Sequence, residues 1–271
     1  MKRLRVLLVT NETKPDAVRA RLEIAAWCRS QRVECADAVQ PVVPGPGTVA
    51  CALGGDGTVL RAATLVAGTG IPVLGVNVGS LGFLSQTSLD DLLPALECLA
   101  RGEYEVEERM RLAYRAGDVA GTALNDLVVA AVAPRLLEMR LAWRGVPATA
   151  LLGDGMIFST PTGTTAYSLS LGGPIVVPTA ECIVMTPHAA HVLGARSLVF
   201  ARDDEVRASA SADVRLVADG DDVGRIPAGT DIVVRRAETP TLLVCPAGAP
   251  GFFSTLTTKL NWPSADPRRV R

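Results

Sequence analysis

The segment Gly54-Gly55-Asp56-Gly57-Thr58 has the residue types and spacing of a loop that handles phosphate groups. It follows an apolar run and precedes a helical pattern, so its glycines could bring backbone N–H groups close to phosphate oxygens at a helix start. Larger residues would block that approach or forbid a positive φ angle. Beside phosphates, Asp56 would need a task of its own, such as holding Mg²⁺ or accepting a proton from an attacking hydroxyl. The alternative is a tight turn in which Asp56 caps the following helix.

A second glycine-rich segment runs from Gly75 to Leu84 and contains Asn77, Gly79 and Gly82. It also comes at the end of an apolar run. If both runs are parallel strands, the two segments face each other where open α/β sheets bind their ligands, outside the carboxyl ends of the strands. An irregular connection explains the same residues equally well.

A third segment, Gly153 to Ser168, is dense in hydroxyl groups and turn-forming residues. A turn of this kind offers hydroxyls, amides and one aromatic ring to a sugar-like or base-like ligand. A decorated β-turn would explain its glycines and Pro161, but not the number of hydroxyls. Asn125 and Asp126 stand ahead of another apolar run, where they could pair with ribose hydroxyls or form an Asx-turn.

The elements that must position these segments change in character near Tyr104. Before it, apolar strands alternate with helical patterns, which predicts a parallel sheet covered on both faces. The expected elements of this part are Arg5–Val9, Pro15–Ser30, Val33–Cys35, Val49–Leu53, Thr58–Val66, Ile71–Val76 and Leu89–Leu99.

After Tyr104, short β-branched segments with alternating polarity predict an all-β, sandwich-like domain. A short helix over Thr164–Leu171 and a last helix over Phe252–Leu260 are expected besides the strands. The expected strands are Leu112–Arg115, Leu127–Val132, Met139–Trp143, Met156–Ser159, Cys182–Thr186, Val206–Ser209, Val214–Ala218, Ile232–Arg236 and Leu242–Cys245.

Composition and charge argue against several classes of protein. The formal net charge of −1 and the 4% of aromatic residues favour neither a basic nucleic-acid-binding face nor a base-stacking platform. The chain has no apolar run long enough for a membrane span, and its basic start lacks the cleavage site of a signal peptide. Its six cysteines form no CxxC pair, which is typical of free thiols in a reducing compartment, so a cytoplasmic location is expected.

Taken in order, these segments resemble the motifs of the NAD kinase family. The loop Gly54–Thr58 with Arg61 is similar to the GGDGT motif, and Asn77–Leu84 is similar to the GxNxGxLGFL stretch. Asn125-Asp126 resembles the family's Asn-Glu/Asp pair, and Asp154–Ser170 resembles DGxxxSTPTGSTAYxxS. Two further segments, Glu108–Leu112 and Gly251–Trp262, resemble a short basic segment and the C-terminal signature.

The resemblance implies a two-domain fold. A Rossmann-like α/β domain over residues 1–102 carries the GGDGT loop, and a β-rich NAD-binding domain covers residues 103–249. The C-terminal segment from about residue 250 to 271 forms a helix that returns to the first domain, and the active site lies in the crevice between the domains. The resemblance also implies a homo-oligomer, dimer or tetramer, with NAD sites completed across subunits.

The implied activity is phosphorylation of the 2′-hydroxyl of the adenosine ribose of NAD, giving NADP. The donor would be ATP with Mg²⁺, or polyphosphate, and Asp56 would be the catalytic base. Asn125 and Asp126 would hold the adenine side of NAD, and Asp154 the nicotinamide side or the dinucleotide of a neighbouring subunit. Together, the implied binding residues are Gly55, Asp56, Gly57, Thr58, Arg61, Asn77, Asn125, Asp126, Arg135, Asp154, Thr165, Ala166, Tyr167, Ser168, Ser170 and Ala189.

The sequence departs from the family pattern at Leu152, where many relatives carry a basic residue, and over Thr186–His191. For the two histidines of that stretch, a structural role is favoured over metal binding. Two alternative functions remain. One is a kinase that uses the GGDGT loop on another acceptor, such as a lipid, which the hydroxyl-rich turn disfavours. The other is a dinucleotide-binding sensor without catalysis, which an intact loop with Asp56 disfavours.

Overall fold

The structure is a computed structural model that describes residues 4–79, 82–85, 87–133 and 136–263. The chain divides into two compact units. The first comprises residues 1–108 and 241–271, and the second comprises residues 109–240. No helix in the described ranges is both long and apolar enough to cross a membrane.

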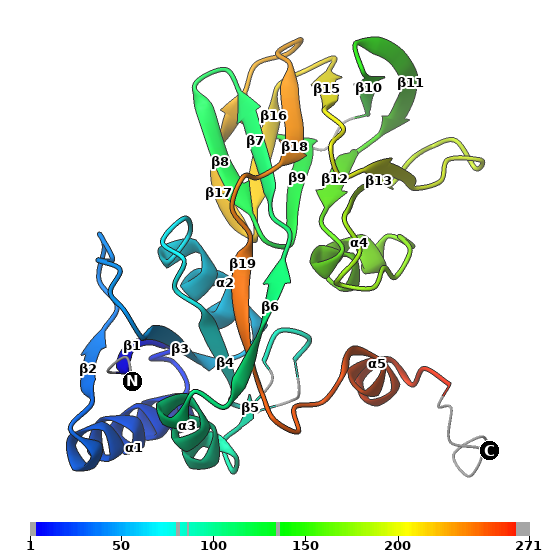
Figure 1. Cartoon of the computed structure of the whole chain (residues 1–271). Helices are drawn as coiled ribbons and strands as arrows, with labels where there is room; N and C mark the ends of the chain where they lie inside the picture. The colour runs from blue at the N-terminus through cyan, green and yellow to red at the C-terminus, as the bar shows by residue number, and fades with distance from the viewer. Residues whose placement is uncertain (1–3, 80–81, 86, 134–135, 264–271) are drawn as a thin grey trace. The chain divides into compact units, whose positions relative to one another are not determined.

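The first unit is an α/β layer structure (Figure 1). Along its sheet the strands follow the order β2-β1-β3-β4-β19-β6, and the short β5 pairs with β4. Its strands are β1 (Arg5–Thr10), β2 (Glu34–Asp37), β3 (Thr48–Gly54), β4 (Val73–Asn77), β5 (Thr87–Ser88), β6 (Tyr104–Arg109) and β19 (Thr241–Pro246). Its helices are α1 (Pro15–Gln31), α2 (Asp56–Leu65), α3 (Leu92–Arg101) and α5 (Phe252–Leu260).

The central strands of this sheet are parallel and buried on both faces. β3 pairs with β1 on one side and with β4 on the other, and all of its seven residues are buried. A fully apolar strand with helices over its faces is the expected sequence pattern of a parallel sheet. Because the strands are parallel, the residues that follow β1, β3 and β4 all emerge at one edge of the sheet. The predicted α/β domain with its GGDGT loop is confirmed.

Two strands belong to this sheet that the sequence placed elsewhere. The strand expected over Leu242–Cys245 was assigned to the β-rich domain of residues 103–249, which also included Tyr104–Arg109, but β6 and β19 extend the first sheet beyond β4. Alternating polarity identifies a strand, but it does not specify which sheet that strand joins. The last helix forms over the predicted residues, and the ring of Phe252 lies 6.4 Å from that of Phe83 in the same unit.

The second unit is a sandwich of two antiparallel sheets with a common apolar core. One sheet has the order β11-β10-β15-β18-β7-β8, and the other has the order β14-β13-β12-β9-β16-β17. The strands are β7 (Leu112–Ala116), β8 (Val119–Ala123), β9 (Asp126–Ala131), β10 (Leu137–Trp143), β11 (Val146–Gly153), β12 (Gly155–Ser159), β13 (Cys182–His188), β14 (Leu198–Ala201), β15 (Val206–Ala210), β16 (Val214–Ala218), β17 (Asp221–Ile226) and β18 (Ile232–Arg236). A 3₁₀ turn, η1 (Thr162–Thr165), and a short helix, α4 (Tyr167–Ser170), follow β12, where a single short helix was expected.

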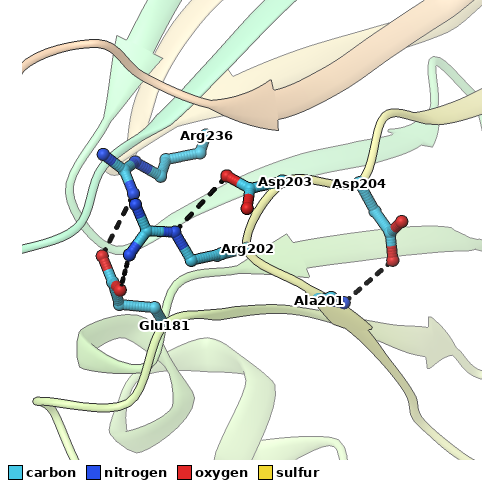
Figure 2. A network of polar contacts seen from close by, with 6 residues as sticks. All are labelled: Glu181, Ala201, Arg202, Asp203, Asp204 and Arg236. Atoms are coloured by element: carbon cyan, nitrogen blue, oxygen red, sulfur yellow. Dashed lines mark hydrogen bonds and ion pairs between the residues drawn. The ribbon is translucent and has the colours of Figure 1, made fainter.

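Ion pairs connect the two sheets at one side of the sandwich (Figure 2). The Glu181 carboxylate, just ahead of β13, contacts Arg202 after β14 and Arg236 at the end of β18. The second of these contacts measures 3.1 Å. All three side chains are at least about one third exposed, so the network adds no more than ~1 kcal/mol per pair to stability. The shared apolar core is the main stabilising element of the unit.

At Gly75 in β4 the fold has no room for a side chain. A Cβ atom there would lie 2.8 Å from the Leu84 carbonyl oxygen and 2.9 Å from the Ser85 Cα atom. We expect Gly75→Ala to lower the free energy of unfolding by about 1–3 kcal/mol, because backbone must move to accept the methyl group. Urea unfolding followed by circular dichroism measures this change.

Gly194→Ala is the matched control, because a Cβ atom at Gly194 meets no atom within 4 Å. An equal loss of stability in both variants would contradict the close approach of the residue 82–85 segment to β4.

Candidate functional site

The first glycine loop joins β3 directly to α2. Gly54 ends the strand, Gly55 is the N-cap residue, and Asp56 is the first residue of the helix. The helix therefore begins two residues earlier than the sequence indicated, and Gly57 and Thr58 lie in its first turn. A Cβ atom on Gly54 would come within 2.1 Å of the Thr58 hydroxyl oxygen, so glycine is required for the chain to turn this sharply into the helix.

The Asp56 carboxylate connects the two glycine-rich segments. It accepts hydrogen bonds from the backbone N–H groups of Phe83 at 2.8 Å and Leu84 at 3.1 Å, and from the Ser85 hydroxyl at 3.3 Å. A Cβ atom on Gly82 would lie 1.9 Å from one of its oxygens. Asp56 makes no side-chain cap of α2, which the turn interpretation required. Its carboxylate instead fixes the position of the second segment.

Asn77 lies at the same edge of the sheet as the loop. It ends β4 and pairs in parallel register with Gly54 at the end of β3. The residue is 8% exposed, and its Nδ2 atom donates to the Gly79 carbonyl at 3.2 Å. Its Oδ1 atom is buried and accepts no hydrogen bond from the described residues. A buried amide oxygen without a partner is an acceptor that a ligand hydroxyl could satisfy.

Two basic side chains contact this edge of the sheet. Arg61 extends from α2 and donates to the carbonyl of Thr10, the last residue of β1. Lys14, the N-cap residue of α1, donates from Nζ to the Val78 carbonyl at 2.9 Å. Sequence reasoning identified Arg61 but missed Lys14. In the sequence, Lys14 is simply the residue before a helix that starts with proline, and no motif includes it.

In the second unit, the hydroxyl-rich turn packs directly on Asn125 and Asp126. Asp126, at the start of β9, lies opposite Ser159, at the end of β12. The Thr160 hydroxyl donates to the Leu124 carbonyl at 2.6 Å, and the Thr160 N–H donates to the Asn125 carbonyl at 2.9 Å. A Cβ atom on Gly163 would lie 1.9 Å from that same Asn125 oxygen. Two motifs that are separate in the sequence thus form one surface.

Asp219 holds this surface in place, and sequence reasoning missed it. Its carboxylate accepts hydrogen bonds from three successive backbone N–H groups, those of Leu124 and Asn125 at 2.7 Å and Asp126 at 3.3 Å. Asp219 has a φ of 50° in the turn between β16 and β17. An Asp-Gly pair between two strands is a common hairpin signal, so nothing in the sequence marked this residue as part of a site.

Burial raises the pKa of both carboxyl groups here. For Asp126, which is 5% exposed, burial and the nearby Asp219 raise the pKa to about 7. For Asp219, burial also raises the pKa, although the three backbone N–H donors and the Arg111 cation oppose this shift. The Arg111 guanidinium is itself buried and donates to the Thr122 hydroxyl at 2.9 Å.

The remaining residues of the turn divide into exposed and supporting ones. Tyr167 and Ser170 are exposed, and Thr165 and Ala166 are half-buried. Ser168 is fully buried, and its hydroxyl lies 2.8 Å from that of Thr186 on β13. Of these residues, Ser168 packs in the interior and supports the turn, and its side chain does not face solvent.

Tyr167, Asp154 and Ala189 meet around His188. The Tyr167 hydroxyl lies 3.1 Å from the His188 Nε2 atom, and the two rings pack edge to face at 72°. The backbone N–H of Asp154 donates to the His188 carbonyl at 2.9 Å, and Ala189 follows with a φ of 50°. Arg135, the remaining predicted contact, lies outside the described residues.

The raised pKa of Asp126 gives stability a defined pH dependence. Because the folded state holds the proton of Asp126 up to about pH 7 and the unfolded state releases it near pH 4, stability should fall as pH rises through this range. We expect Asp126→Asn to remove that part of the decline and to make the protein more stable than the wild type at pH 8. Urea unfolding at pH 5 and pH 8 measures both effects.

The exposed Asp118, in the turn between β7 and β8, provides the matched control as Asp118→Asn. Parallel pH profiles for the wild type and Asp126→Asn would show that Asp126 does not carry the proton.

Comparison with known proteins identifies the family. Residues 34–104 match the family model of the ATP-NAD kinase N-terminal domain, and residues 124–245 match that of the ATP-NAD kinase C-terminal domain. An NAD kinase of Geobacter metallireducens is 43% identical over 81% of this chain and 81% of its own length. One of Syntrophotalea carbinolica is 35% identical over 97% of this chain and 99% of its own length.

Two solved structures are similar in fold. Yeast NADH kinase complexed with NADH has a TM-score of 0.86 at 23% identity, covering 98% of this chain and 89% of the other. An NAD kinase from Archaeoglobus fulgidus in complex with ATP has a TM-score of 0.71 at 26% identity, covering 89% and 92%. With motifs, domain models and fold in agreement, this chain belongs to the NAD kinase family.

Proposed function

We propose that this protein transfers the terminal phosphoryl group of ATP to the 2′-hydroxyl of the adenosine ribose of NAD, giving ADP and NADP. The observation that carries this proposal is the Asp56 carboxylate, held by three donors at the junction of two glycine-rich segments. The NAD kinases of Geobacter metallireducens and Syntrophotalea carbinolica resemble this chain over most of its length, which supports the choice of substrates.

Asp56 is assigned as the general base. A carboxylate offers about four acceptor positions, and the three bonds to Phe83, Leu84 and Ser85 leave room for one further donor. The ribose 2′-hydroxyl would be that donor. As its oxygen attacks the γ-phosphorus, its proton passes to Asp56, the bond to the β–γ bridging oxygen breaks, and ADP leaves. A positioned base of this kind contributes about 10²–10⁴-fold to the rate.

The glycine loop and Asn77 are assigned to the same step. Gly55, Gly57 and Thr58 would bring backbone N–H groups to the donor phosphates at the start of α2. Arg61 would lie near the phosphates of NAD. The buried, unpartnered Oδ1 atom of Asn77 would accept a substrate hydroxyl. Mg²⁺ would enter with the donor as part of that substrate, neutralising phosphate charge. Asp56 is the acidic side chain of this loop, and its negative charge is compatible with a phosphate that carries a metal ion.

The second unit is assigned to binding NAD. Asp126, with Asn125 beside it, would accept ribose hydroxyls on the adenine side. The half-buried Thr165 and Ala166 and the exposed Tyr167 and Ser170 would line the dinucleotide pocket, with Ser168 supporting them. Asp154 and Ala189 lie beside His188, where they would contact the nicotinamide side or the NAD of a neighbouring subunit.

We extend the proposal to assembly and location. The exposed Asp154 suits a site completed by a second copy of the chain, as a dimer or tetramer. All six cysteines are free thiols, which suits the reducing conditions of the cytoplasm.

The first experiment is NADP formation by the purified protein with NAD, ATP and Mg²⁺, coupled to an NADP-specific dehydrogenase. We expect Asp56→Asn to lower kcat by about 10²–10⁴-fold, because the variant cannot take the hydroxyl proton. Asp16→Asn, an exposed substitution in α1, is the matched control and should keep full activity. Thermal unfolding confirms that each variant is folded.

Wild-type turnover in a folded Asp56→Asn protein would remove Asp56 from the role of base. Assays with polyphosphate, other triphosphates and NADH define the range of donors and acceptors. Retained NAD binding without turnover for any donor would instead identify a dinucleotide sensor.

A further inference from the structure

Lys14 stands at the edge of the sheet where the two glycine-rich segments meet. β1 ends at Thr10, which lies opposite Leu53 of β3 in parallel register. The chain then turns through Asn11, whose N–H donates to the Leu53 carbonyl at 2.9 Å, and reaches Lys14 just before α1. The residues after β1 and β3 therefore emerge side by side, although 40 positions separate Lys14 from Gly54 in the sequence.

The Lys14 ammonium group lies between both segments. Its Nζ atom donates to the Val78 carbonyl at 2.9 Å. A Cβ atom built on Gly55 and one built on Gly79 would each lie 3.9 Å from that same Nζ atom. The ammonium group thus lies next to the space that a side chain would fill at either glycine.

The charge of Lys14 is not neutralised by the described part of the chain. The side chain is half-buried and forms no ion pair with any carboxylate of the described residues. An ammonium group has three donors, and the Val78 carbonyl accounts for one of them. A partly desolvated cation with free donors beside two glycines is suited to bind an anion, and lysine is a common point-charge ligand of phosphate.

We propose that Lys14 binds the phosphate chain of the phosphoryl donor. This inference rests on the proposed function, in which Asp56 takes the proton of the attacking hydroxyl. The phosphorus under attack must lie about 3–3.5 Å from that hydroxyl oxygen, so the donor's terminal phosphate lies beside Asp56. Gly55 is the residue adjacent to Asp56, and Lys14 reaches it. The pyrophosphate of NAD, by contrast, is attached at the 5′ position, away from the 2′-hydroxyl.

Lys14→Met tests the proposal, because it keeps most of the apolar side chain and removes the charge. We expect the KM for ATP to rise about 10-fold, the loss of roughly one charge-assisted hydrogen bond, while the KM for NAD changes less than about 2-fold. The dependence of kcat/KM for ATP on ionic strength should also weaken, since a cation that attracts the donor is gone. Lys14→Arg should restore part of the ATP affinity.

Arg19→Met is the matched control, since Arg19 is an exposed cation on α1 that pairs with Asp16. It should leave both KM values unchanged. Equal increases in the two KM values of Lys14→Met, together with a lower unfolding temperature, would show that Lys14 only braces the two loops and would overturn the proposal. A rise confined to the KM for NAD would overturn it as well.

Direct binding separates this inference from the proposed function. Calorimetric titration with a non-hydrolysable ATP analogue and Mg²⁺ requires no turnover. Weaker binding to Lys14→Met than to the wild type and Arg19→Met supports the phosphate site, even if the wild type formed no NADP. Equal binding to all three proteins would refute it, even if the wild type were an active NAD kinase.

Discussion

The geometry of the first unit's site depends on the hydrogen bonds that the Asp56 carboxylate accepts. It binds the main chain of Phe83 and Leu84, so the loop after β3 and the segment after β4 form one structure. Phe83 in turn packs near the ring of Phe252 and beneath the Lys259 ammonium, which connects α5 to the same point. One acidic side chain thus organises two glycine-rich segments and the last helix.

In the second unit, the carboxylate of another residue likewise fixes a loop through backbone hydrogen bonds. Asp219 binds three successive N–H groups at the start of β9, just as Asp56 binds two ahead of β5. In both places a carboxylate fixes a loop through its backbone, and Ser85 is the one side-chain partner among the described residues of these loops. Backbone donors do not depend on side-chain rotamers, so each loop keeps its shape at little entropic cost. The functional side chains are thereby free to face a substrate.

Much of this organisation could be predicted from the sequence, because it is local. The parallel strands, the glycine loop and the hydroxyl-rich turn each have a pattern of neighbouring residues. What could not be predicted depends on partners far along the chain. Asp219 lies 95 positions from Leu124, and Lys14 lies 64 positions from Val78. The membership of β6 and β19 in the first sheet is likewise a matter of pairing, which no local alternation of polar and apolar residues specifies.

The buried carboxyl group of Asp126 has a further consequence for the proposed function, in which it accepts a ligand hydroxyl. The pKa of Asp126 is raised to about 7, so near neutral pH this carboxyl group retains part of a proton. A ligand hydroxyl that donates to Asp126 favours the ionised form and displaces this proton into solvent. The association is then linked to proton release. The heat measured on binding would therefore include the ionisation enthalpy of whichever buffer takes up that proton.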